Sequence, residues 1–215
     1  MGNVLDSGSI IAIWNLSLIE ENVLDRIRNP DLLDLTASID IENGLGWCWL
    51  GLCPNWKVKE KIFTHFYKGT TYEQFKQWGH RFTDFVEPML NRQMVDTLKR
   101  HQAEGHTVCV VTASIDEWVR PVCERLGVSM LLATCIEVSA NGTLTGRFLS
   151  PRSDMPLGSS KNCYGAEKAA RLLEAYPQRQ TYKLYAYGNS RGDREMLALA
   201  DESFVIMQKW KSPTP

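Results

Sequence analysis

Three short apolar runs of the chain each end in polar residues that could bind or transform a ligand. Asn15 follows the first run, Thr112 ends the second, and Asn189, Ser190 and Asp193 follow the third. The hydroxyl, amide and carboxylate groups of such side chains bind anions, hold cations or move protons, depending on their surroundings. Backbone amides at strand-to-helix turns add further donors for an anion. The pattern predicts a small-ligand site built from the ends of three strands.

These runs have the composition of central strands in a parallel sheet. They are Ser9–Trp14, Thr107–Thr112 and Tyr182–Tyr187. Continuous apolar runs are typical of strands that are buried on both faces, and a helix-type pattern follows each of the three. Strands that alternate with helices indicate a doubly wound, Rossmann-like α/β core, in which ligands bind beside the carboxyl ends of the strands.

The stretch after the first run is rich in helix formers and aromatics, and it contains no comparable apolar run. Pro30 and Pro54 are its main interruptions. We therefore expect a helical-bundle cap over residues 20–93, inserted into an α/β core formed by residues 1–19 and 94–215. The aromatic side chains of the cap are expected to form its own core or, alternatively, to line an apolar chamber over the site. They are Trp47, Trp49, Trp56, Phe63, Phe66, Tyr67 and Trp78.

Beyond the cap, the pattern predicts helices over Met94–Gly105 and Asp116–Gly127 and a further helix beginning near Gly165. A β-hairpin is expected around Asn141 and Gly142, because an Asn-Gly step is a strong signal for a tight hairpin turn.

The cysteines and histidines do not predict a metal site. The six cysteines form no CxxC pair, and several lie in apolar runs where a thiol behaves as a small hydrophobe, so we expect them to be reduced. His65 and His80 have no acid or cysteine at ligand spacing. His101 and His106 flank a surface turn, and both are expected to be solvated.

The composition is that of an ordinary globular protein. Lys and Arg total 24 against 25 Asp and Glu, and the resulting formal charge of −1 provides no global field for nucleic acid or anionic lipid. The most apolar window, residues 44–53, is too short to span a bilayer. No secretory signal is apparent in the first residues. We therefore expect a cytoplasmic protein without nucleic-acid or membrane partners.

Several segments resemble those of the haloacid dehalogenase superfamily, in particular its subfamily IB, which includes phosphoserine phosphatases. They are Val110-Val-Thr-Ala-Ser114, Asn162-Cys-Tyr-Gly-Ala-Glu-Lys168 and the stretch from Lys183 to Asp201, which contains Tyr187-Gly-Asn-Ser-Arg-Gly-Asp193. The segment Pro54–Lys61 is similar to the helical cap of the same subgroup. This resemblance implies a Rossmann-like core, a four-helix cap and magnesium-dependent phosphatase chemistry.

The chain departs from the family pattern at the acids that the chemistry needs. The family's first strand ends in Asp-x-Asp-x-Thr, where the first carboxylate attacks phosphorus and the second protonates the leaving oxygen. Here Asn15 and Ser17 stand at those positions, and an alignment with a two-residue gap, which matches Ser17 to the threonine, supplies no carboxylate either. Asn189 replaces a metal-ligating aspartate. We expect phosphatase activity to be absent or very weak and magnesium to bind weakly or not at all.

The resemblance assigns the retained residues to the phosphate-binding half of the site. Thr112, with Ala113, would hold a phosphoryl oxygen, although a hydroxyl there could also cap the next turn. Either Lys168 or Lys161 would neutralise the phosphate, and Ser190 and Asn189 would line the loop. Asp193 would orient the lysine or a water, or cap a helix. Such a site carries no net charge without metal, so an anion could still bind.

Two functions remain open on the sequence alone. The first is a pseudophosphatase with a regulatory or pathway-accessory role, which recognises a small anionic or phosphorylated metabolite or a protein partner. The second is an active hydrolase that uses another acid, such as Glu20 or Glu21, or an enzyme that performs metal-independent chemistry in the same pocket.

Overall fold

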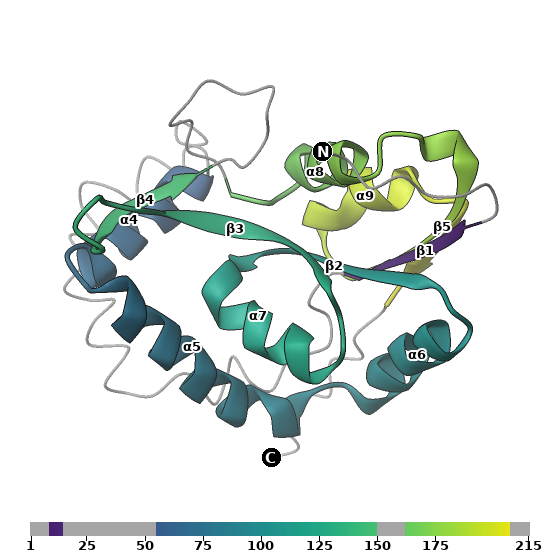
Figure 1. Cartoon of the computed structure of the whole chain (residues 1–215). Coiled ribbons are helices and arrows are strands. Elements are labelled where there is room, and N and C mark those ends of the chain that lie inside the picture. Colours follow the sequence, from purple (N-terminus) through teal and green to yellow (C-terminus); the bar gives the residue numbers. More distant parts are fainter. Residues whose placement is uncertain (1–8, 15–54, 150–161, 207–215) are drawn as a thin grey trace, which may run out of the picture.

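The protein was analysed as a computed structural model, which describes residues 9–14, 55–149 and 162–206 (Figure 1). These residues contain one six-stranded sheet in the order β4-β3-β2-β1-β5-β6. The strands are β1 Ser9–Trp14, β2 Thr107–Ile115, β3 Met130–Val138, β4 Leu144–Leu149, β5 Tyr182–Gly188 and β6 Glu202–Val205. β1 is parallel to its neighbours β2 and β5, so the three predicted central strands are confirmed.

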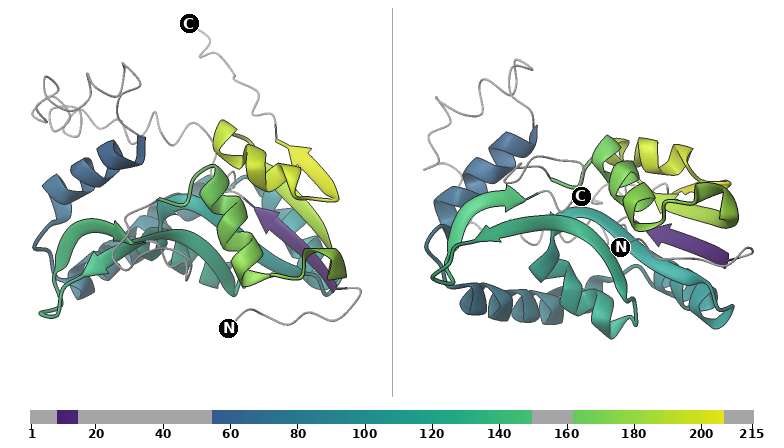
Figure 2. Two further views of the ribbon diagram at one scale, coloured as in Figure 1. Left: turned by 90° about the horizontal axis from the view of Figure 1, so that it is seen from above. Right: turned by 45° about the horizontal axis from the view of Figure 1, so that its top comes forward.

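Helices cover both faces of the sheet, as expected for a doubly wound core. They are α4 Asn55–Tyr67, α5 Tyr72–Val86, α6 Arg92–Ala103, α7 Asp116–Arg125, α8 Ala166–Ala175 and α9 Arg194–Ala198. Figure 2 shows α6 and α7 on one side of the parallel strands and α8 and α9 on the other. The predicted helices over Met94–Gly105 and Asp116–Gly127, and the helix near Gly165, correspond to α6, α7 and α8 within a few residues.

Alternation along β2 explains why its sequence is apolar without interruption. Val108 and Val110 belong to the cluster that contains side chains of α6 and α7, whereas Cys109 and Val111 belong to the cluster that contains side chains of α8 and α9. Successive side chains of a strand point to opposite faces, so a strand covered on both sides needs apolar residues at every position. This packing on both faces holds β2 in place and thereby positions Thr112, which follows Val111 in the strand.

An antiparallel hairpin extends the sheet beyond its parallel part. β3 pairs with β4, and the turn between them is closed by hydrogen bonds from the Ser139 amide to the Thr143 carbonyl (2.8 Å) and from the Gly142 amide to the Ser139 carbonyl (2.9 Å). Gly142 has φ +77°, a conformation that favours glycine. The hairpin predicted from the Asn-Gly step is confirmed.

The helices α4 and α5, which fall within the predicted cap, pack against this hairpin and against α7 (Figure 2). Phe63 of α4 and Phe75 of α5 are buried in one cluster with Phe148 of β4, and Tyr67 packs against it. The Thr64 hydroxyl donates to the Gly146 carbonyl at 2.7 Å. Phe63 and Tyr67 thus pack in a core that α4 and α5 share with the β3–β4 hairpin and α7, rather than in a core of the cap alone. Trp47 and Trp49 lie outside the described residues.

The cysteines and the lengths of the helices bear on two of the expectations from composition. Cys109, Cys123, Cys135 and Cys163 are free thiols, as expected for reduced cysteines. No helix in the described part of the chain is long and apolar enough to cross a membrane.

Candidate functional site

The predicted site segments meet at the carboxyl edge of the sheet, on the two strands that flank β1. Trp14, the last residue of β1, pairs with Val110 of β2 and with Tyr187 of β5. Thr112 follows Val110 by two residues within β2, where the pairing with β3 shifts between Val111 and Ile115, and Asn189 follows Tyr187 by two residues, just after β5. Both residues therefore lie near the carboxyl end of β1, one on either side of it. Ligand sites of open α/β sheets occupy this position, where adjacent strands connect in opposite directions. Asn15, Ser17 and Lys161 lie outside the described residues.

A buried ion pair joins α8 to the loop after β5. The Lys168 ammonium lies 2.5 Å from Oδ1 of Asp193, and the side chains are only 2% and 0% exposed. Lys168 belongs to the first turns of α8, and Asp193 ends the 3-10 helix η3 (Arg191–Asp193). Lys168, one of the two candidate lysines, therefore contacts Asp193, whereas Lys161 lies outside the described residues.

The second carboxylate oxygen of Asp193 organises the loop itself. Oδ2 accepts hydrogen bonds from the Ser190 amide (2.9 Å), the Ser190 hydroxyl (2.7 Å) and the Asn189 amide (3.2 Å). Burial alone would raise the pKa of Asp193, but the Lys168 charge and the bonds from Lys168 and Ser190 together lower it below its ordinary value. Asp193 is therefore ionised at neutral pH, and it both orients the lysine and caps the turn, so the two roles considered from the sequence coexist.

Close backbone packing brings the loop against the start of α8. A Cβ atom at Gly192 would lie 2.3 Å from the ring of Tyr164, so the ring would have to move to admit a side chain. The Gly165 amide donates to the Gly192 carbonyl at 3.1 Å. Glycine at position 192 thus allows the loop and the start of α8 to lie in direct contact.

The carboxyl end of β2 is irregular, and side chains from other elements hold it. The Thr112 hydroxyl accepts the Ser114 amide at 3.1 Å, which is the capping role considered from the sequence, and its own O–H hydrogen is a donor for a ligand. The carbonyl of Ala113 accepts hydrogen bonds from the Thr134 hydroxyl (2.8 Å) and from the Lys59 ammonium. The Ala113 carbonyl is thus a structural acceptor that fixes this end of the strand.

Lys59 is a site residue that sequence reasoning missed. It lies on α4, 54 residues from Ala113 in the chain, and brings a positive charge to the carboxyl end of β2. Burial lowers the pKa of Lys59 to about 8, although the nearby Cys163 opposes the shift. The segment Pro54–Lys61 was recognised as cap-like, but nothing in its pattern marks one of its lysines as the one that reaches the core.

The described donor set at this edge does not fit magnesium. Magnesium prefers octahedral coordination by anionic oxygen and water. Both oxygens of Asp193 already face an ammonium group or N–H and O–H donors, and Asn189 offers only a neutral amide oxygen. Counted at their formal charges, the side chains of Lys59, Lys168 and Asp193 sum to +1, which favours an anion over a cation.

Comparison with known proteins agrees with this architecture. The profile of the haloacid dehalogenase-like hydrolase family matches residues 50–198. Protein CicA of Caulobacter vibrioides is 32% identical over 147 residues, which cover 68% of this chain and 61% of CicA. A probable phosphatase of Mycobacterium tuberculosis, Rv3661, is 30% identical over 128 residues, which cover 57% of this chain and 39% of that protein. The chain thus spans about three fifths of CicA and less of the mycobacterial relative.

Solved structures share the fold at low sequence identity. A protein of unknown function from Bordetella pertussis superimposes with a TM-score of 0.68 at 19% identity and covers 92% of this chain and 90% of its own. A probable phosphoserine phosphatase from Vibrio cholerae gives a TM-score of 0.61 at 13% identity, over 94% of this chain and 58% of its own. Together with the family profile, which covers well over half of the residues, these matches show that the chain belongs to the haloacid dehalogenase-like hydrolase family and has the fold of its phosphoserine phosphatases.

Proposed function

We propose that this family member has lost phosphomonoesterase activity and acts as a binding or regulatory protein for a small anionic or phosphorylated ligand. The observation that carries the proposal is the state of Asp193, the one carboxylate among the described site residues discussed above. Its two oxygens are bound to Lys168 and to the donors of its own loop. A carboxylate in this state supports the site but is not free to attack phosphorus or to ligate a metal.

The residue types at the other catalytic positions support the same conclusion. An amide oxygen, as in Asn15, is neutral and a poor nucleophile, and the hydroxyl of Ser17 does not exchange protons near neutral pH. Asn189 offers no charge to a metal. We further propose that α4 and α5 belong to a helical cap over residues 20–93, which would cover the site from the side of Lys59.

The charges that remain suit an anion such as phosphate. Lys59 and Lys168 provide ammonium groups, and Thr112 provides a hydroxyl donor. An ammonium carries three N–H donors, so the bond from Lys168 to Asp193 is compatible with a second acceptor. The amides of Asn189 and Ser190 donate to Asp193. Recognition would therefore depend mainly on the two lysines and Thr112.

Anion binding can be measured directly by calorimetric titration with inorganic phosphate and with phosphomonoesters. We expect saturable binding, and we expect Thr112→Val to weaken it about tenfold or more, because a hydrogen bond to a charged group is lost. Thr97→Val is the matched control, since the Thr97 hydroxyl bonds to the Gln93 carbonyl within α6. If no anion produces heat or a thermal shift, the ligand-binding role is rejected and recognition of a protein partner becomes the proposal.

A second candidate function is catalysis, and one observation favours it. The pair formed by Lys168 and Asp193 is fully buried beside the carboxyl ends of the strands, and buried charged groups at such a position are candidates for catalytic groups. The mycobacterial relative, moreover, is named a probable phosphatase. On this alternative, the chain is an active hydrolase or an enzyme with metal-independent chemistry in the same pocket, and turnover assays distinguish it from the first proposal.

A further inference from the structure

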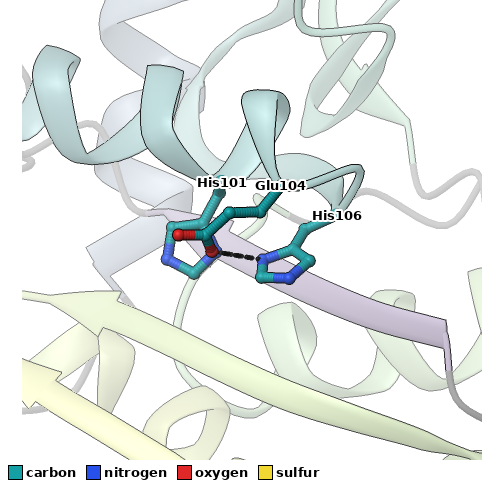
Figure 3. A group of neighbouring side chains, drawn as sticks. All are labelled: His101, Glu104 and His106. Carbon is teal, nitrogen blue, oxygen red and sulfur yellow. Dashed lines mark hydrogen bonds and ion pairs between the residues drawn. The ribbon is translucent and has the colours of Figure 1, made fainter.

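A second cluster of polar side chains lies at the opposite, amino end of β2. It comprises His101 at the end of α6, Glu104 in the following turn, and His106 immediately before the strand (Figure 3). One ligand atom from each residue can be chosen so that all three lie within 4.8 Å of one another. The expectation that both histidines are solvated was wrong for His101, which is only 3% exposed.

The imidazole rings of His101 and His106 face each other through their Nδ1 atoms. Nδ1 of His101 lies 2.8 Å from Nδ1 of His106, and the Glu104 carboxylate lies 3.5 Å from the latter atom. Two imidazole lone pairs at this distance repel each other, so a proton or a cation must lie between them. The half-exposed carboxylate of Glu104 supplies negative charge beside these two nitrogens.

The other nitrogen of His101 has a partner of its own. Nε2 lies 2.9 Å from the hydroxyl of Tyr187 on β5. If the Nε2–H group donates to that hydroxyl, the lone pair of His101 resides on Nδ1 and points toward His106 and Glu104. Metal-ligating histidines are held in this way, with one nitrogen on the metal and the other bonded to an outer partner that fixes the tautomer.

Charged groups of both signs surround the cluster. Arg100, next to His101 in the chain, disfavours a cation, whereas Glu104, half exposed, provides both a counter-charge and access from solvent.

We propose that His101, Glu104 and His106 form a three-ligand site for a divalent transition metal of the zinc type. Two imidazole nitrogens and one carboxylate, completed by water, make a tetrahedral donor set that suits zinc and is a poor match for magnesium. The ion would tie the end of α6 to the start of β2. Through Tyr187, it would also support β5 two residues before Asn189.

The test uses the full chain without a polyhistidine tag. Cobalt(II) is titrated as a spectroscopic probe, because its visible absorption is much stronger in four-coordinate than in six-coordinate sites, and zinc is then added as a competitor. We expect one equivalent of cobalt bound in a four-coordinate environment and displaced by zinc. Glu104→Gln and His106→Gln should each abolish the tetrahedral spectrum, while His80→Gln, at an exposed histidine on α5, should leave it unchanged.

Tyr187→Phe separates metal ligation from a hydrogen-bonded histidine pair. It leaves all three ligands in place and removes the hydroxyl that partners Nε2 of His101 and also bonds to Arg100, so zinc affinity should fall about 10- to 100-fold. The proposal is overturned if the wild type binds no cobalt or zinc stoichiometrically. It is also overturned if binding persists unchanged in Glu104→Gln and His106→Gln. Neither result bears on phosphate binding at the other edge of the sheet, so the two proposals fail independently.

Discussion

Incubated with magnesium and phosphomonoesters such as phosphoserine and p-nitrophenyl phosphate, the protein is expected to release no phosphate above the uncatalysed background. Loss of a catalytic nucleophile alone lowers turnover by on the order of 10⁴ to 10⁶. On the proposal made above, Asn15, Ser17 and Asn189 stand where the family has acids, and Asp193 is bound to Lys168 and its own loop. Release of inorganic phosphate, followed continuously over the panel, measures the effect.

Variants of the site distinguish the pseudophosphatase proposal from the hydrolase alternative. Asn15→Asp, Ser17→Asp and Asn189→Asp combined should restore measurable turnover if the site geometry is retained, whereas Asn189→Asp alone supplies a metal ligand without a nucleophile and should stay inactive. Clear wild-type turnover that survives Asn15→Ala but is lost in Glu20→Gln or Glu21→Gln would establish the hydrolase alternative. The pseudophosphatase proposal would then be wrong.

Removal of one partner of the buried ion pair is expected to produce the largest loss of stability. Lys168→Met leaves the Asp193 carboxylate buried without its counter-charge, and such changes cost about 3–5 kcal/mol of unfolding free energy. Urea denaturation measures the change. The double variant Lys168→Met with Asp193→Leu should recover part of the loss, because no charge then remains buried. Lys183→Met breaks the exposed pair with Glu202 and serves as the control, with little expected change.

The same pair gives a pH dependence with a definite sign. The pKa of Asp193 is lower in the folded protein than in the unfolded chain, so its contribution is complete above the ordinary aspartate value of about 3.9 and disappears as pH falls through the folded value. The urea midpoint of the wild type should therefore decline in this acidic range, and Asp193→Asn should reduce that decline. Equal stability of Lys168→Met and wild type would show that the buried pair does not form.

The strands were predictable because burial on both faces leaves a local mark. Every position of β2 from Val108 to Val111 is apolar, since helices cover both sides of the sheet. The hairpin turn is marked just as locally by Asn141 and Gly142. The strands and the turn depend on residues that are neighbours in the sequence, so they can be predicted from one sequence alone.

The contacts that build the site were less accessible to sequence reasoning. Lys59 reaches Ala113 across 54 residues, and Lys168 meets Asp193 across 25. Such pairings depend on how α4 and α8 pack in three dimensions, and no local pattern encodes them. The family resemblance suggested Lys168, whereas it gave no reason to select Lys59.

The error about His101 had a detectable cause. The turn that His101 and His106 flank suggested a solvated helix end. However, Leu98 follows Met94 by four residues, His101 follows Leu98 by three, and all three are buried. This helical periodicity places His101 on the apolar face of α6, and it is a better guide to burial here than the nearby turn.

The central claim is that the site no longer holds a hard dication, and magnesium titration tests it most directly. The experiment is best done by calorimetry on Glu104→Gln, which removes the separate His101–Glu104–His106 cluster from consideration. The proposal predicts no saturable magnesium binding, because Asn189 and the lysine-bound Asp193 offer too little free negative charge. One equivalent of magnesium bound in octahedral coordination, and lost in Asn189→Ala, would contradict it.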